Sequence, residues 1–138
     1  MKDALQSIEE YERFVYSLEE RHPGIKVSKL VVIRRGPHHC VLQGRVEFEH
    51  EIYLQIYERI DFLDCRIAYY SYEVHQRDAV LFWYDPQPHP NDPALAINHP
   101  HHKHIHPDIK HHRIPAPEIS FERPNLTFLI EEIVENLL

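Results

Sequence analysis

The stretch HCVLQGRVEFEHEIYLQIYERIDF, residues 39–62, decides the fold. In its first half, apolar or small residues alternate with polar ones, which is the pattern of a half-buried strand. In its second half, apolar residues recur at every second position from Ile52 to Phe62, with one exception at Glu58. Residues 48–51 allow a tight reversal between the halves, although they lack Asn-Gly turn chemistry. The stretch therefore predicts an antiparallel hairpin with one face on a hydrophobic core.

One charged residue interrupts the apolar face of this hairpin. Glu58 lies between Ile56 and Ile60, on the face that the alternation assigns to the core. Burial of an unpaired carboxylate is costly, so Glu58 needs a specific partner or lines a cleft. An ion pair with an Arg of a neighbouring strand is the structural explanation, and a place in a reactive site is the functional one. The sequence alone leaves both open.

Further strands and two helices are predicted around the hairpin. β-Branched and aromatic runs predict strands at residues 25–35, 65–74 and 79–85. Apolar residues at helical spacing predict a first helix over residues 3–22, capped by Asp3 with Gln6 three positions later. The same spacing predicts a last helix over residues 125–138, capped by Asn125. All five predicted strands lie within residues 25–85, where antiparallel neighbours are expected.

The segment 86–124 differs in composition from the rest of the chain. It holds nine of the 11 prolines, which exclude a long helix and disfavour a regular central strand. Its apolar residues, such as Ile109 and Phe121, favour an ordered, extended segment that wraps over the sheet. The expected fold is α+β: a mainly antiparallel five-stranded sheet, N- and C-terminal helices and a long Pro/His-rich loop. The length is that of a single domain over residues 1–138.

Charge and cysteine content limit the function classes. The formal net charge is −7, which argues against a broad surface that coats nucleic acid. Eight of the 13 histidines lie between His89 and His112, so this region becomes a cationic patch when they are protonated. The two cysteines are far apart and form no CxxC motif, which is typical of thiols in a reducing compartment. No stretch is long and apolar enough to cross a bilayer, and we expect a soluble cytoplasmic protein.

The histidine-rich stretch NHPHHKHIHP, residues 98–107, is the most unusual part of the sequence. In an extended segment, His102, His104 and His106 share one face, and His99 and His101 have the other parity. No HExxH motif or Cys partner supports a particular metal, so we expect no cofactor and only adventitious Zn or Ni binding. A solvated loop is the plainest alternative.

Metal-independent cleavage of RNA by its own 2′-hydroxyl fits this stretch. That reaction needs a base for the hydroxyl, an acid for the leaving 5′-oxygen and a cation for the charged phosphorane. In this hypothesis His102 or His104 is the general base or acid, and Lys103 holds the phosphate. Glu58 or Asp85 orients an imidazole.

Four stretches of the chain resemble the TumE family, the presumed toxin of a type II toxin–antitoxin module. They are GRVEFEHEIYLQIYERID (44–61), YYSYEV (69–74), LFWYDPQPHP (81–90) and HPHHKHI (99–105), in the family's order. The family's turn after Tyr-Asp usually reads Asn-Ala-Pro-His-His-Pro, whereas this chain has Pro-Gln-Pro-His-Pro and one His fewer. The resemblance implies a growth-inhibiting toxin that a helix-turn-helix-type antitoxin neutralises.

The resemblance and the chemistry together give the candidate site. The proposed catalytic residues are Glu58, Asp85, His101, His102, Lys103 and His104. The proposed substrate-binding residues, which also match motif positions of the family, are Tyr70, Tyr84, His89 and His99. The sequence thus predicts a toxin that acts on RNA, as an endoribonuclease. A non-enzymatic binding module, a metal-binding protein, and a homodimer with an exchanged Pro-rich arm stay open.

Overall fold

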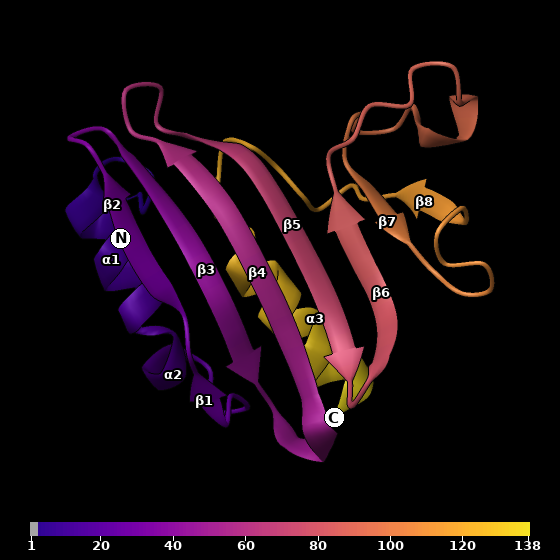
Figure 1. The fold of residues 1–138 in the computed structure, drawn as a ribbon, viewed down its shortest axis with the longest axis horizontal. Coiled ribbons are helices and arrows are strands. Elements are labelled where there is room, and N and C mark those ends of the chain that lie inside the picture. Colours follow the sequence, from indigo (N-terminus) through magenta and orange to yellow (C-terminus); the bar gives the residue numbers. More distant parts are fainter. Residues whose placement is uncertain (1–2) are drawn as a thin grey trace.

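The computed structural model describes residues 3–138 and is built around one antiparallel sheet (Figure 1). The strands lie in the order β1-β3-β4-β5-β6-β7-β8, and β2 pairs with β3 beside β1. Their bounds are β1 Val27–Ser28, β2 Val31–Arg35, β3 His39–Glu47, β4 Ile52–Asp61, β5 Arg66–Gln76, β6 Ala79–Asp85, β7 His102–His104 and β8 Arg113–Pro115. The α+β class and the predicted hairpin, now β3 and β4, are confirmed. The predicted number of five strands is wrong, because the sheet has eight.

The first extra strand arises where the run 25–35 breaks into β1 and β2. Both halves pair with β3, and the break lies opposite Gly44. Gly44 has φ +128°, and a Cβ at this position would lie 2.3 Å from the carbonyl oxygen of Lys29. Only glycine fits such a close approach of two backbones. The break is therefore dictated by a residue on the neighbouring strand, which a reading of residues 25–35 alone does not reveal.

The other two extra strands come from the Pro/His-rich segment. The segment is ordered, as expected, but it also pairs in register: β7 lies between β6 and β8. A central strand is possible here because residues 101–106 contain no proline. Pro115, in contrast, lies in β8 at the edge of the sheet, where a missing N–H is tolerated. A short 3₁₀ turn, η2 Pro93–Leu95, precedes β7.

All three α-helices cover the same face of the sheet (Figure 1). They are α1 Ile8–Tyr16, α2 Leu18–Arg21 and α3 Leu126–Leu137. The predicted first helix over residues 3–22 begins later and is divided at Ser17. Ser7 rather than Asp3 is its cap, because the Ser7 hydroxyl accepts the Glu10 N–H, whereas the Asp3 carboxylate accepts the N–H of Leu5. The opposite face of the sheet carries no α-helix from residues 3–138 and is called the open face below.

The last helix confirms the expected position but not the expected cap. Asn125 precedes α3 and is buried, yet its side chain does not bind the helix N-terminus. Its amide instead donates to the Tyr72 hydroxyl at 3.0 Å and accepts the N–H of Ser120 at 3.0 Å. The helix start is thereby tied to the middle of β5. The core between sheet and helices is thus connected by polar as well as apolar contacts.

Candidate functional site

Strand β7 sends its side chains alternately to the two faces of the sheet. His102 and His104 lie opposite Asp85 and Trp83 of β6 and share the open face with them. Lys103 lies opposite Tyr84, whose hydroxyl binds Glu132 of α3 on the helix-covered face. The predicted common face of His102 and His104 is therefore confirmed. The third member of that parity, His106, lies beyond the strand and binds the carbonyl oxygen of Val80 at 2.8 Å.

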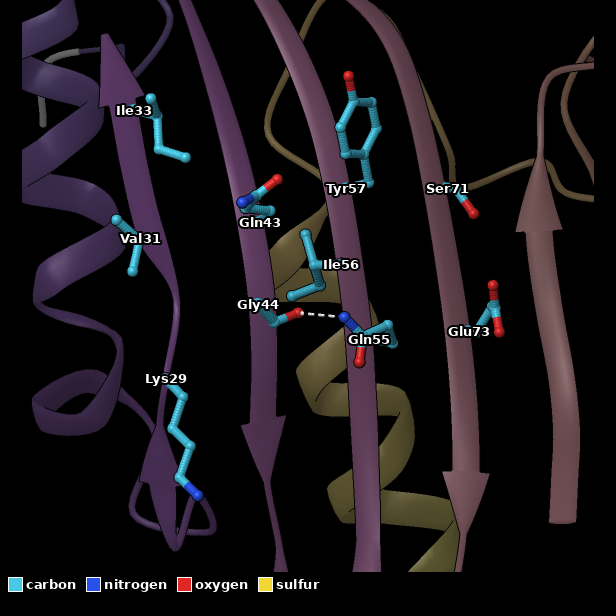
Figure 2. Close-up of a pocket in the computed structure, with 10 residues that line it drawn as sticks. All are labelled: Lys29, Val31, Ile33, Gln43, Gly44, Gln55, Ile56, Tyr57, Ser71 and Glu73. Atoms are coloured by element: carbon cyan, nitrogen blue, oxygen red, sulfur yellow. Dashed lines mark hydrogen bonds between the residues drawn. The ribbon is translucent and has the colours of Figure 1, made fainter. Parts of the chain in front are cut away.

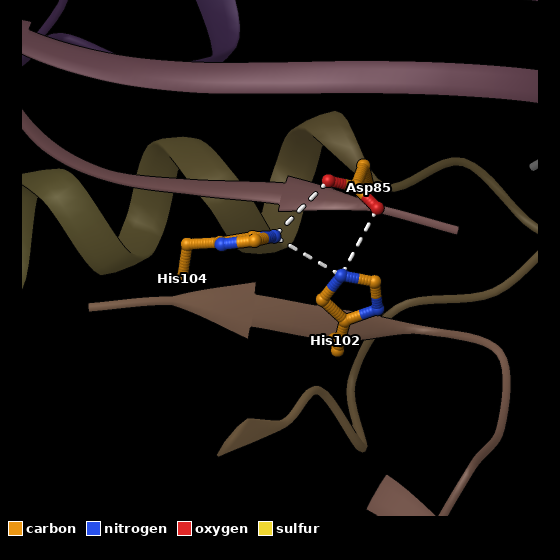
Figure 3. Close-up of side chains that lie close together, drawn as sticks. All are labelled: Asp85, His102 and His104. Carbon is orange, nitrogen blue, oxygen red and sulfur yellow. Dashed lines mark hydrogen bonds and ion pairs between the residues drawn. The ribbon is translucent and has the colours of Figure 1, made fainter. Parts of the chain in front are cut away.

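Asp85, His102 and His104 form a compact cluster at the end of β6 (Figure 3). Nε2 of His102 lies 3.0 Å from Oδ1 of Asp85, and Nε2 of His104 lies 3.2 Å from Oδ2. The two Nε2 atoms are 3.1 Å apart. His102 is 1% exposed and His104 5%, whereas the Asp85 side chain is 20% exposed. The cluster therefore opens to the surface on the carboxylate side.

The outer nitrogens of both imidazoles are held by the backbone. Nδ1 of His102 lies 3.1 Å from the carbonyl oxygen of Pro100, and Nδ1 of His104 lies 2.9 Å from that of Ile109. A carbonyl oxygen only accepts, so each Nδ1 is the donor. The indole of Trp83 stacks on His104 with the ring centres 4.1 Å apart. Two backbone contacts and one stacking contact thus fix the orientation of both rings.

The electrostatic surroundings favour an ionised Asp85. Burial acts to raise the pKa of this carboxyl, but hydrogen bonds from His102, the Gln87 N–H and the Trp83 indole hold it well below its usual range. Burial lowers the pKa of His104 below the ordinary histidine value, which favours the neutral ring. The cluster therefore combines a carboxylate with an uncharged imidazole in a largely dry environment.

Arg113 is a functional candidate that the sequence analysis did not identify. It lies on β8 opposite His104, so its side chain belongs to the face of the cluster. Its Nε is buried without a hydrogen-bond partner, and within residues 3–138 its guanidinium forms no ion pair. An uncommitted guanidinium is a ready anion-binding group. Only the pairing of β7 with β8, which the sequence does not display, brings Arg113 to this place.

His89 is the accessible imidazole of the site. It is half-buried, and its ring meets that of His102 edge-on with the centres 5.0 Å apart. Partial burial lowers the pKa of His89, and the positive charge of Arg113 lowers it further. A neutral imidazole beside an uncommitted guanidinium is suited to proton transfer next to a bound anion.

Lys103 lies away from the cluster, although it stands between the two histidines in the sequence. Its Nζ is 3.1 Å from the Glu132 carboxylate and 4.1 Å from the centre of the Phe82 ring. Glu132 also accepts the hydroxyl of Tyr84 at 2.9 Å. Lys103 and Tyr84 therefore bind α3 to the sheet and do not face the two imidazoles.

Glu58 belongs to a second polar network, on the helix-covered face. Its carboxylate accepts the hydroxyls of Tyr11 and Tyr72, which replaces the ion pair with an Arg that the sequence suggested. Burial raises the pKa of Glu58, although the two hydroxyl donors oppose this effect. The contacts of Glu58 are with tyrosines and not with an imidazole.

The remaining predicted site residues lie on the same side as Glu58 or at the surface. Tyr70 stacks on Tyr72 with ring centres 4.7 Å apart, and its hydroxyl lies 2.6 Å from Nδ1 of His101. His101 is buried against Phe121. His99 is exposed at the surface. Of the ten predicted residues, the structure thus brings Asp85, His89, His102 and His104 together.

The open face of the sheet carries a shallow hollow that borders β6 at Glu73. The hollow has a volume of about 520 Å³, and Figure 2 shows side chains from β2, β3, β4 and β5 around it. Tyr57 and Ser71 line its end nearer to β5, and Glu73 lies opposite Trp83 of β6. A cationic side chain covers an aromatic ring on this face: Arg59 lies over the ring of Tyr69, and Tyr69 is 38% exposed.

Comparison with known proteins agrees with the family resemblance seen in the sequence. The model of the family described as "Toxin TumE" matches residues 14–138, which is nearly the whole chain. No curated protein and no solved structure matches this chain. None of the helices within residues 3–138 is long and apolar enough to cross a membrane. A toxin of this kind implies an antitoxin as its partner. The extent of the match shows that the chain belongs to the TumE toxin family.

Proposed function

We propose that this toxin inhibits growth by cleaving RNA at the cluster of Asp85, His102 and His104. The observation that carries the proposal is the uncommitted guanidinium of Arg113 on the face of the cluster, next to the accessible imidazole of His89. A phosphodiester needs a cation at its oxygens and a proton acceptor at the attacking hydroxyl. Arg113 and His89 supply these two groups.

The open face supports RNA, and a single strand in particular, as the substrate. Proteins bind single strands by stacking bases on aromatic rings and arginine planes. Here the guanidinium of Arg45 lies 4.6 Å from the ring centre of Tyr53, and that of Arg59 lies 5.4 Å from that of Tyr69. Tyr53 also stacks on His75 with ring centres 4.7 Å apart. These stacked pairs lie on the open face at the two ends of the hollow, and Glu73 connects the hollow to β6.

In the proposed reaction the RNA supplies its own nucleophile. His89 takes the proton of a 2′-hydroxyl, whose oxygen attacks the adjacent phosphorus, and Arg113 stabilises the charged phosphorane. The P–O5′ bond then breaks, and the leaving 5′-oxygen takes the proton that a protonated His102 shares with Asp85, by way of the partly exposed carboxylate. Water then returns a proton to the cluster, and His89 releases the proton that it took from the 2′-hydroxyl. The products are a 2′,3′-cyclic phosphate and a 5′-hydroxyl end.

The geometry changes the roles that the sequence suggested. His102 and His104 are nearly buried and point at Asp85, so the accessible His89 is the better base. Lys103 is bound to Glu132, so Arg113 replaces it as the phosphate-holding cation. We further propose that the partner is the helix-turn-helix-type antitoxin expected from the resemblance, and that it covers this site when it neutralises the toxin.

Induction in a bacterial host tests the reaction. The wild type is compared with His89→Gln/Arg113→Gln and with the control Lys110→Gln/His111→Gln, which removes one cation and one imidazole at exposed positions of the same segment. Wild type and control should arrest growth and yield RNA fragments with 5′-hydroxyl ends. The His89/Arg113 variant should do neither at equal soluble expression.

Two outcomes would overturn the proposal. Growth arrest by the wild type with intact RNA would leave a toxin that blocks a protein partner without an enzymatic reaction. Undiminished RNA cleavage by the His89/Arg113 variant would place the reaction elsewhere on the chain.

A further inference from the structure

We infer that Asp85, His102 and His104 form a binding site for one divalent transition-metal ion. This inference stands on the geometry of the cluster and does not require that RNA is the substrate. It departs from the metal-independent reaction predicted from the sequence. In this inference a metal cation, and not a proton, is held between the three side chains.

The distances within the cluster are those of ligands around one ion. The two Nε2 atoms are 3.1 Å apart, and each lies near a different oxygen of the Asp85 carboxylate, His102 at 3.0 Å from Oδ1 and His104 at 3.2 Å from Oδ2. Metal–ligand bonds of about 2.1 Å place neighbouring ligand atoms about 3.0 Å apart in octahedral and about 3.4 Å apart in tetrahedral geometry. The 3.1 Å between the two Nε2 atoms lies within this interval, and the carboxylate has one oxygen within the same range of each imidazole. Two imidazoles and one carboxylate are a ligand set that zinc and other transition metals use.

The hydrogen bonds around the cluster favour a cation between the three side chains. Because Nδ1 of each ring donates to a backbone carbonyl oxygen, each neutral ring directs the lone pair of Nε2 inward. Each Nε2 then faces the other ring and one oxygen of the Asp85 carboxylate, so His102 can donate to Asp85 only when its ring carries a second proton. Such a proton bridges two of the three side chains, whereas a metal ion binds all three. The donation from Nδ1 to a carbonyl is also the usual outer contact of a metal-bound histidine.

Burial of the imidazoles supports ligation over direct proton transfer. His102 and His104 are 1% and 5% exposed, so neither ring reaches a bound substrate. The Asp85 side chain is 20% exposed, which leaves one side of the ion accessible. Three protein ligands and an accessible position are typical of catalytic metal sites, where the remaining ligand is water or a substrate oxygen. Arg113 and His89 lie on this face, where they would meet a phosphate bound to the ion.

Calorimetric titration of the untagged, metal-depleted full chain tests the inference. The probes are Zn²⁺ and Mn²⁺, with Mg²⁺ as the ion that prefers oxygen ligands. The wild type is compared with His102→Gln/His104→Gln and with His111→Gln/His112→Gln, which removes two exposed histidines of the same segment. One tight equivalent of Zn²⁺ or Mn²⁺ is expected for the wild type and the control. The affinity should fall at least tenfold in the His102/His104 variant, and Mg²⁺ should not compete.

The result that overturns the inference is equal stoichiometry and affinity for the wild type and the His102/His104 variant. Loss of binding only in the His111/His112 variant would overturn it as well, because the ion would then be adventitious. Circular dichroism shows whether each variant is folded. Should the double variant not fold, Asp85→Asn keeps both imidazoles and must still weaken Zn²⁺ binding at least tenfold. The titration contains no RNA, so its outcome is separate from that of the ribonuclease experiment.

Discussion

Two carboxylates on opposite faces of the sheet show how differently this fold uses a buried acid. Glu58 faces the helices and accepts two tyrosine hydroxyls, so the donors and acceptors of its network match. Asp85 faces the open side and meets two imidazole nitrogens that, in neutral rings, are also acceptors. Burial raises the pKa of Glu58, whereas hydrogen bonds hold that of Asp85 low despite burial. The first network pairs donors with acceptors, whereas the second brings a carboxylate and two imidazole nitrogens together.

The largest expected effect is the loss of stability in Glu58→Ala. The substitution removes a fully buried side chain and leaves the hydroxyls of Tyr11 and Tyr72 without their acceptor. The cavity and the unsatisfied donors together should lower the free energy of unfolding by at least about 3 kcal/mol. Chemical denaturation measures the loss. Asp85→Ala is the matched variant and should lose less, because Asp85 is partly exposed. An equal loss would abolish the distinction between the two networks.

The pH dependence of the free energy of unfolding should show that the pKa of Glu58 is raised in the folded state. In an unfolded chain a Glu has a pKa of about 4.3, and burial raises the pKa of Glu58 above this value. The folded state then binds the extra proton, so the free energy of unfolding falls as the pH rises from about 4.3 through the folded pKa. The slope for one group is at most about 1.4 kcal/mol per pH unit.

Glu58→Gln isolates this contribution from the other titrating groups. It keeps the shape of the side chain and one acceptor oxygen but cannot ionise. Denaturation of both proteins between about pH 4 and pH 8 gives the difference between their curves. That difference should shift in favour of Glu58→Gln as the pH rises. A difference that is constant with pH would show that Glu58 titrates normally.

The sequence predicted the parts of the fold that repeat over many residues. Strands such as β3 and β4 alternate long enough to show which side chains face the core, and Glu58 was placed correctly because of that alternation. β7 and β8 have three residues each, too few to display a period. The break at Lys29 depends on Gly44 of another strand. The contacts that the sequence did not predict are therefore those between strands that are short or far apart along the chain.

The same limit explains the candidate site. Strand alternation correctly predicted that His102 and His104 share a face, and it also separates Lys103 from both. The residues of HHKH were nevertheless predicted to form one site, because they are adjacent in the chain. Arg113 enters the site only through the pairing of β7 with β8, which lies across a turn of eight residues, 105–112. Proximity in a sheet is set by register more than by sequence distance.

A smaller effect on stability is expected at the buried His101, which lies apart from the cluster. Tyr70→Phe removes the hydrogen bond to Nδ1 of His101 within the helix-covered face. The free energy of unfolding should fall by about 1 to 2 kcal/mol, the usual cost of a lost buried hydrogen bond. Toxicity should be unchanged at equal expression, because Tyr70 is not on the open face. Denaturation and a growth assay measure the two effects. Loss of toxicity by a stable variant would extend the site to the core side.

The smallest expected effect belongs to Lys103→Met. The substitution keeps the apolar stem over Phe82 and removes an ion pair with Glu132, which should cost about 0.5 to 1 kcal/mol. Growth arrest should match the wild type, because Lys103 faces α3 and not the two imidazoles. Arg113→Met is the matched variant: it removes a cation from the open face, where no ion pair holds it, and should abolish growth arrest. If instead Lys103→Met abolished arrest and Arg113→Met retained it, the phosphate would bind on the helix-covered face, and the division of roles between the two faces would be reversed.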